Sequence, residues 1–116
     1  MPDPTPSRRP SVQDRNLVDM FFTRADRLAD RARFRHCVHG TWRDVSWQDA
    51  AKRVRRIAAA FLELGVRRGD RVCLMSGTRT AWIECDLGIL SAGAVSVPIY
   101  PSSTAEECAF ILWNAG

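Results

Sequence analysis

The stretch MSGTRTAW, residues 75–82, contains the small and hydroxyl-bearing residues with which proteins surround phosphate groups. It joins a strand-like run, RVCLM, to a helix-like run that begins near Thr80. Such a turn binds phosphate when glycines free several backbone N–H groups and a lysine adds positive charge. Here there is one glycine and no lysine. We therefore expect a tight corner in which Gly77 permits the bend and Thr78 or Thr80 caps the helix. Arg79 is expected to be solvated.

Two histidines, His36 and His39, could ligate a metal ion, but no acidic or cysteine partner lies at metal-ligand spacing. None of the cysteines forms a C-x-x-C pair, which excludes the usual zinc and thioredoxin-like patterns. Three of the four lie in apolar runs, which predicts buried, reduced thiols in a cytosolic protein. The four are Cys37, Cys73, Cys85 and Cys108. The sequence therefore predicts no metal site.

A basic cluster, Lys52, Arg53, Arg55 and Arg56, lies away from the apolar stripe of a predicted helix. A solvated helix face explains it, and a binding patch for an anionic tail or a lipid surface is the alternative. The formal net charge is +4, from 17 basic and 13 acidic residues. This excess would ease contact with an anionic ligand but does not indicate nucleic-acid binding.

Composition and length predict one small globular domain, because 46% of the 116 residues are hydrophobic. Arg8-Arg9 lacks the apolar stretch of a twin-arginine leader. The longest uncharged run, LGILSAGAVSVPIYPSSTA, contains two prolines and cannot span a membrane as a helix. We expect a cytoplasmic protein, with peripheral contact at the inner membrane surface as an option.

The first half of the chain predicts a helix, a hairpin and a second helix. Residues 1–15 contain four prolines among polar residues and are expected to form a disordered leader. Asn16 is placed to cap the first helix. His39-Gly40 suits a two-residue hairpin turn, and Ser46 then caps a helix that Gly65 ends. The apolar stripe expected on that helix is Trp47, Ala50, Ala51, Val54, Ile57, Ala58, Phe61 and Leu62.

The second half predicts a βαβ unit followed by a final helix. RVCLM and AVSVP are the two strands, the second closed by Pro98, and they flank a helix that Gly93 stops. The strands should be parallel, with a right-handed crossover. Thr104 and Glu107 have capping-box spacing at the start of the last helix.

This α/β arrangement is expected to be incomplete as a stand-alone fold. The helix over residues 80–92 is apolar in two directions, which predicts burial on both sides. Parallel strands are normally flanked by further strands and covered on both faces. We therefore interpret the sequence as the opening of a larger domain, and expect marginal stability with aggregation through uncovered strand edges.

With these elements in place, residues 17–116 resemble the N-terminal region of AMP-forming acyl-CoA synthetases of the adenylate-forming superfamily. The resemblance is carried by DVSWQDAAKRVRRIAAAFLELGVRRGDRVCLMS and by AWIECDLGILSAGAVSVPIYPSSTAEECAFIL. LSAGAVSVPI, residues 90–99, is similar to an early superfamily motif. Tyr100, where amino-acid-activating members carry Asp, together with VPIYPSS and TAEE, is most like the long-chain fatty acid branch. Arg68, Gly77, Thr80 and Trp113 depart from the family pattern.

The resemblance implies a two-step reaction in the full-length enzyme. ATP and Mg²⁺ convert a fatty acid to acyl-adenylate, and coenzyme A then displaces AMP. The family's phosphate loop, ribose-binding Asp and catalytic Lys have no counterpart in this sequence, so no catalytic, cofactor-binding or metal residue is assigned. The isolated chain is expected to be inactive and to bind no cofactor. The alternatives are a stand-alone anion-binding module and an interaction module that docks on a complementary chain, either the missing C-terminal part or another copy.

Overall fold

The computed structural model describes residues 14–116, and the predicted leader lies almost entirely outside them. The described residues form four helices and two small sheets in the predicted order, which confirms the α/β fold class. The elements are α1 (Leu17–Leu28), β1 (Ala32–Val38), β2 (Thr41–Ser46), α2 (Trp47–Glu63), β3 (Arg71–Met75), α3 (Thr80–Ser91), β4 (Val95–Ile99) and α4 (Ala105–Ala115).

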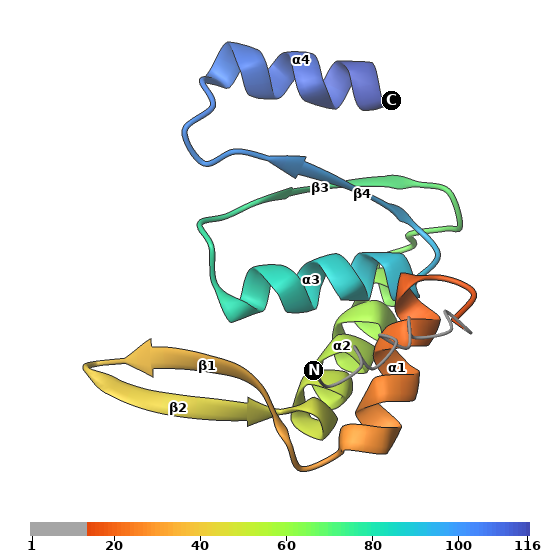
Figure 1. The fold of residues 1–116 in the computed structure, drawn as a ribbon. Coiled ribbons are helices and arrows are strands. Elements are labelled where there is room, and N and C mark those ends of the chain that lie inside the picture. The colour runs from red at the N-terminus through yellow and green to blue at the C-terminus, as the bar shows by residue number, and fades with distance from the viewer. Residues whose placement is uncertain (1–13) are drawn as a thin grey trace, which may run out of the picture.

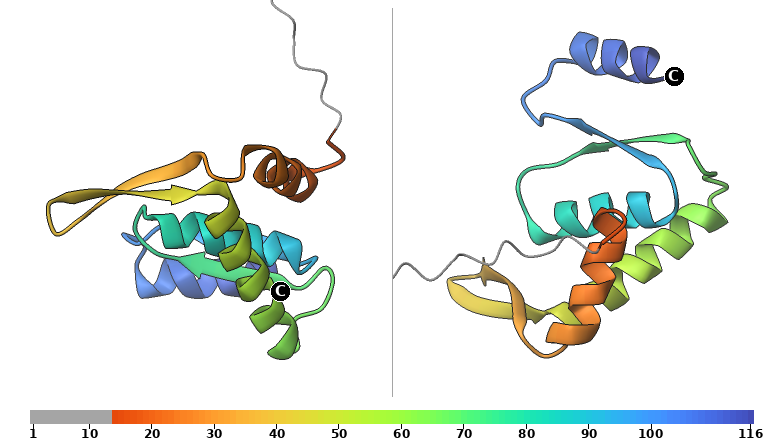
Figure 2. Two further views of the ribbon diagram at one scale, coloured as in Figure 1. Left: turned by 90° about the horizontal axis from the view of Figure 1, so that it is seen from below. Right: turned by 45° about the vertical axis from the view of Figure 1, so that its right-hand side comes forward.

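The elements stack in tiers, as Figure 1 shows. Helices α1 and α2 lie together, with the β1–β2 hairpin projecting from them as an arm. Helix α3 lies against α2, and the β3–β4 sheet separates α3 from α4 (Figures 1 and 2). No helix in residues 14–116 is long and apolar enough to cross a membrane.

Local hydrogen bonds start the first two helices where the sequence predicts. The side chain of Asn16 accepts from Asp19 N–H at 2.8 Å, and Ser46 Oγ accepts from Asp49 N–H at 3.1 Å. The hairpin turns through His39 and Gly40, whose φ angles are 49° and 79°. Two positive φ angles in succession match the right-handed twist of the flanking strands.

The core lies between the two N-terminal helices, β2 and α3. Alanines on α2 let its neighbours approach closely, and Phe21 and Leu87 fill the space from α1 and α3. Four residues of the predicted stripe of α2 are buried, Trp47 and Ile57 are half-buried, and Leu62 is 55% exposed. The buried residues of this cluster are Phe21, Ala25, Val45, Ala50, Ala51, Val54 and Leu87.

Helices α2 and α3 meet most closely at Gly88. This residue is buried in α3, and a Cβ atom built there would overlap Ile57 Cγ2 and lie 2.9 Å from Ile57 Cβ. Contacts of that length are below van der Waals separation. The hydrogen atom of glycine is therefore what lets the two backbones pack side by side.

Strands β3 and β4 are parallel, as predicted, with Arg71 opposite Val95 and Met75 opposite Ile99. The expectation that Pro98 closes the second strand is wrong by one residue. Pro98 pairs with Leu74 inside the ladder, and the strand continues to Ile99. A proline is tolerated in an edge strand when the missing N–H would have pointed outward.

Helix α4 is held at its ends but hardly buried. Thr104 and Glu107 form the predicted capping box, with bonds of 2.8 and 3.2 Å. None of its residues is fully buried, and Phe110 and Trp113 are 62% and 80% exposed. These two aromatic side chains of the helix therefore face outward.

Arg33 on β1 lies among three aromatic rings, an arrangement that the sequence analysis missed. Its guanidinium carbon lies 4.2 Å from the ring centre of Trp47, 4.8 Å from that of Phe34 and 4.9 Å from that of Phe21. Burial lowers the pKa of Arg33 from its usual value, with nearby Arg24 as a smaller cause. The cation joins the hairpin arm to the helical core.

Replacing Arg33 by alanine is expected to lower the free energy of unfolding by about 1–2 kcal/mol, because a partly desolvated cation loses three ring contacts. Urea unfolding of the variant chain measures this loss. Arg43→Ala on the exposed face of β2 is the matched control and should change stability by less than about 0.5 kcal/mol. Equal effects of the two substitutions would show that the ring contacts do not stabilise the arm.

Candidate functional site

The carboxyl ends of β3 and β4 form the natural place to look for a ligand site, because parallel α/β sheets bind ligands at that edge. A hollow of about 450 Å³ lies there, between the corner after β3 and the segment after β4. Its lining is mainly apolar and aromatic, with Arg79 as the only charged residue. The lining residues are Ser76, Thr78, Arg79, Trp82, Ile83, Pro98, Ile99, Tyr100 and Pro101.

The corner itself differs from the expectation at two points. Arg79, not Thr78 or Thr80, is the N-cap residue of α3, and no side chain bonds to the first N–H groups of the helix. Thr80 is already the first helical residue, which removes it from the capping position. Gly77 does not have a positive φ, and a Cβ there would meet nothing within 4 Å. The bend therefore does not depend on glycine.

The chemistry available in this hollow is limited. Adenylate formation needs a cradle for phosphate, a carboxylate for the metal ion and positive charge for developing anions. The lining offers one arginine and three hydroxyl groups, those of Ser76, Thr78 and Tyr100, and contains no carboxylate, lysine or histidine. The residues present therefore do not fit ATP with its Mg²⁺ ion, and no catalytic step can be assigned to them.

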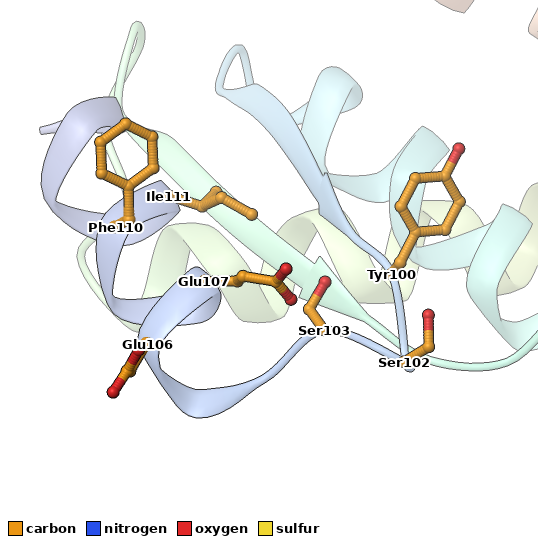
Figure 3. A pocket seen from close by; sticks show the side chains of 7 residues that line it. All are labelled: Tyr100, Ser102, Ser103, Glu106, Glu107, Phe110 and Ile111. Atoms are coloured by element: carbon orange, nitrogen blue, oxygen red, sulfur yellow. The ribbon is translucent and has the colours of Figure 1, made fainter.

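A second hollow, of about 660 Å³, lies between the β4–α4 segment and α4 (Figure 3). Tyr100 and Phe110 stand on opposite sides of it, and Glu106 points away. Glu107 faces Ser103 in the figure, but its carboxylate already accepts a hydrogen bond from Thr104 N–H at 2.8 Å. The only inward carboxylate thus serves the helix cap. This surface is better suited to packing than to catalysis.

The basic cluster on α2 is exposed, as expected, but three of its four residues have partners within the chain. Lys52 Nζ lies 3.8 Å from Asp49, and Arg55 lies over the ring of Phe22 at 4.6 Å. Arg53 Nη1 donates to Glu84 Oε1 at 3.2 Å, and Glu84 is only 5% exposed. The expectation of a merely solvated face is therefore wrong for Arg53. The cluster has little charge left to form an anion-binding patch.

The histidine and cysteine side chains do not lie together at one place in the structure. Within residues 14–116, no group of three or more His, Cys, Asp or Glu side chains lies close enough to hold a metal ion. His39 is exposed in the hairpin turn, and His36 is half-buried on β1. All four cysteines are free thiols, but none is fully buried, and Cys37 is exposed. The prediction of buried thiols is therefore wrong: Cys73 on the two-stranded sheet, Cys85 on α3 and Cys108 on α4 are all only half-buried.

Cys85 should react with an alkylating reagent far more slowly than Cys37. Burial raises the pKa of the Cys85 thiol, the Glu84 carboxylate raises it further, and Arg79 opposes this weakly. At neutral pH its thiolate fraction is therefore reduced, while Cys37 is exposed. Mass spectrometry after timed iodoacetamide treatment should show labelling of Cys37 at least about 10-fold faster. Labelling of Cys85 should accelerate at higher pH, and equal rates at neutral pH would contradict the prediction.

The comparison that decides the family covers most of the chain. A family model described as AMP-binding enzyme matches residues 21–116. The chain belongs to the AMP-binding enzyme family. This confirms the resemblance on which the sequence analysis relied.

Curated relatives of this AMP-binding family chain include ligases for long-chain fatty acids. It is 38% identical over 100 residues to "Long-chain-fatty-acid--CoA ligase FadD15" of Mycobacterium bovis, covering 86% of this chain and 17% of the relative. It is also 42% identical over 72 residues to "Uncharacterized protein Rv1549" of Mycobacterium tuberculosis, covering 62% of this chain and 41% of that protein. The chain thus spans about a sixth of the ligase's length.

Solved structures show the same fold. A fatty acid AMP ligase from Legionella pneumophila matches with a TM-score of 0.80 and 26% identity, over 89% of this chain and 18% of that one. A fatty acyl-adenylate ligase from the same organism, in complex with acyl adenylate and pyrophosphate, matches with a TM-score of 0.72 and 29% identity, over 77% of this chain and 16% of that one. The helices and the βαβ unit therefore belong to an adenylate-forming fold.

Proposed function

We propose that this chain forms the N-terminal scaffold of an AMP-dependent long-chain fatty acid–CoA ligase. The complete enzyme would activate a fatty acid with ATP and Mg²⁺ and transfer the acyl group to coenzyme A. The observation that carries the proposal is the family match over residues 21–116, and the 38% identity to the FadD15 ligase supports the choice of substrate. The proposal places the enzyme in the cytoplasm, where ATP and coenzyme A are available, with peripheral membrane contact as an option.

Within this proposal, residues 16–116 are the N-terminal portion of the AMP-binding domain and residues 1–15 a leader. Their role is to build helices and strands on which the working residues of the ligase rest. Support comes from the hollow at the carboxyl ends of β3 and β4, whose only charged residue is Arg79. No residue of this chain is assigned a catalytic, cofactor-binding or metal-binding role.

The 116-residue chain alone is expected to form no acyl-adenylate. ATP–pyrophosphate exchange, measured with palmitate and Mg²⁺, should remain at background, because residues 14–116 place no phosphate cradle and no metal-binding carboxylate at the sheet edge. Full-length FadD15 provides the positive control under the same conditions. Exchange that rises with the concentration of the purified 116-residue chain would overturn the assignment of a scaffold role.

A second candidate function is that of an interaction module that docks on a complementary chain. The observation that favours it is the exposed apolar surface of α4 beside a sheet of only two strands. Such surface is characteristic of protein–protein contact sites. The anion-binding alternative has no comparable support, because Lys52, Arg53 and Arg55 already have partners.

A further inference from the structure

Arg33 is an extra residue in the β1–β2 ladder. Ala32 pairs with Ser46 and Phe34 pairs with Val45, so two steps along β1 correspond to one step along β2. A β-bulge of this kind commonly changes the direction of a side chain. Here the guanidinium lies among three aromatic rings. The irregularity of the strand therefore places a cation at the junction of β1, α1 and α2.

The three rings around Arg33 are held by contacts that do not involve the arginine. Phe21 on α1 is 2% exposed and belongs to the core, and Phe34 and Trp47 pack against that core. The ring centres of Phe21 and Trp47 lie 5.9 Å apart. We call Phe21, Phe34 and Trp47 the aromatic cage. Because core packing positions its walls, the cage should keep its shape when the cation is removed.

Backbone hydrogen bonds also fix the start of β1 independently of the Arg33 side chain. Trp47 N–H donates to the Arg31 carbonyl at 3.0 Å, and Gln48 N–H donates to the Ala29 carbonyl at 3.0 Å. These bonds join the segment before β1 to the first turn of α2, at the base of the hairpin arm (Figure 1). A variant that lacks the Arg33 side chain should therefore keep the same chain path beside the aromatic cage.

The rings, and not an anion, are the partners of the Arg33 charge. No carboxylate in residues 14–116 forms an ion pair with Arg33, and its Nε is buried without a hydrogen-bond partner. The face of an aromatic ring attracts a cation, and guanidinium suits such a site because it is flat and more weakly hydrated than an ammonium ion. The aromatic cage therefore has the chemistry of a site for organic cations.

We propose that the aromatic cage is a binding site for small guanidinium cations, and that Arg33 is its ligand within the same chain. The filled cage joins the hairpin arm to the helical core, so its occupancy controls how firmly the arm is held. A strongly hydrated cation, such as sodium or an alkylammonium ion, fits the site poorly. The cage shares no residue with the hollow at the edge of the β3–β4 sheet, and its role goes beyond the proposed ligase function.

The test is rescue of an Arg33→Ala chain by a free guanidinium cation. This substitution removes the side chain beyond Cβ, and methylguanidinium is small enough to occupy the space that it leaves. At about 20 mM, methylguanidinium chloride should raise the melting temperature of the variant by about 2–4 °C relative to the same concentration of sodium chloride. The wild-type chain, whose cage is filled, should show no rise. Absence of the rise in the variant, or an equal rise in the wild-type chain, would overturn the proposal.

Two other arginines provide matched controls. Arg55 lies over the single ring of Phe22, at 4.6 Å, and Arg43 is exposed on β2. The Arg55→Ala and Arg43→Ala chains should gain less than about 1 °C from the same addition of methylguanidinium. A gain equal to that of the Arg33→Ala chain would show that the cation acts on the protein surface in general.

Two changes test the chemistry of the site. Arg33→Lys keeps the positive charge but loses the flat, weakly hydrated group, and it should recover less than about half of the melting temperature lost in Arg33→Ala. Full recovery would show that any cation serves. Adding Trp47→Leu to the Arg33→Ala chain removes one wall of the cage and should abolish the rescue. Rescue that persists without this ring would place the bound cation elsewhere.

Nuclear magnetic resonance locates the cation without a melting transition. In the Arg33→Ala chain, methylguanidinium should shift the indole N–H signal of Trp47 in a saturable way, with half-saturation at about 1–20 mM. The indole signals of Trp82 and Trp113, which lie outside the cage, should not move. Equal movement of all three signals would contradict binding in the cage.

The wild-type chain gives an answer even if the Arg33→Ala chain does not fold. The Nε–H signal of Arg33 should be displaced to lower frequency by the ring currents of the cage. Its hydrogen should exchange with water at least about 10-fold more slowly than that of Arg43, because Arg33 Nε is buried. An Arg33 signal with the frequency and exchange rate of Arg43 would show that the cage is not filled, and would overturn the proposal.

Discussion

A chain carrying Gly88→Ala is expected to lose about 1–3 kcal/mol of its free energy of unfolding. In an ordinary helix this change would gain up to about 1 kcal/mol, because alanine has the higher helix propensity. Here the added methyl group would overlap Ile57 Cγ2, which is attached directly to a β-branched carbon and cannot swing away. Either α2 and α3 separate or Ile57 leaves its rotamer, and both cost packing energy.

Urea unfolding at low protein concentration measures this loss, with Gly77→Ala as the matched control. Gly77 has open space at its Cβ position and should tolerate alanine within about 0.5 kcal/mol. Gly88→Ala combined with Ile57→Ala should cost less than the sum of the two single changes, because the overlap is removed. Simple additivity of the two changes would show that the close contact does not determine stability.

Replacing Arg53 is expected to cause the second large loss in the free energy of unfolding. Arg53→Met should cost about 1–3 kcal/mol, because it leaves the buried Glu84 carboxylate without its hydrogen-bond donor. The arginine side chain is itself about half exposed, which keeps the loss below that of a fully buried pair. Arg56→Met, on the same helix, tests the general effect of losing a surface cation.

The double variant Arg53→Met, Glu84→Gln identifies the cause. If the unpaired carboxylate is what destabilises the Arg53→Met chain, a neutral amide at position 84 should restore most of the lost stability. The restoration is read from the midpoint of urea unfolding. A double variant that is less stable than either single variant would show that Arg53 acts through packing of its hydrocarbon stem instead.

Short-range features of this fold could be predicted from the sequence because they depend on neighbouring residues. The caps at Asn16, Ser46 and Thr104 each place a side-chain oxygen three residues before the N–H that it accepts from. The His39-Gly40 turn and the parallel βαβ unit follow from equally local signals. The assignment to adenylate-forming enzymes likewise rested on contiguous motifs.

Features that join distant parts of the chain could not be predicted in the same way. Arg53 and Glu84 are 31 positions apart, and periodicity alone placed Arg53 on a solvated face. The contact of Gly88 with Ile57 depends on how α2 crosses α3. The run AWIECDLGIL contains two acidic residues, Glu84 and Asp86, and the sequence alone does not show that Glu84 is the one that is buried and paired.

The corner after β3 shows why the candidate site was only partly foreseen. The lack of a lysine and a second glycine in MSGTRTAW is visible in the sequence alone, and it is the ground for expecting no phosphate loop there. The prediction of a threonine cap was wrong, because Arg79 is the N-cap and α3 begins at Thr80. A cap at Thr78 would start the helix at residue 79, and a cap at Thr80 would start it at residue 81.

The projecting β1–β2 arm offers a practical attachment point. Its turn at His39-Gly40 is exposed and lies at the far end from the helical core, and neighbouring Trp42 is 67% exposed. A dye or a short epitope inserted into this turn would therefore sit on an arm that Arg33 holds to the helical core. It would lie away from α4 and the β3–β4 sheet, and so could report on binding there without blocking it.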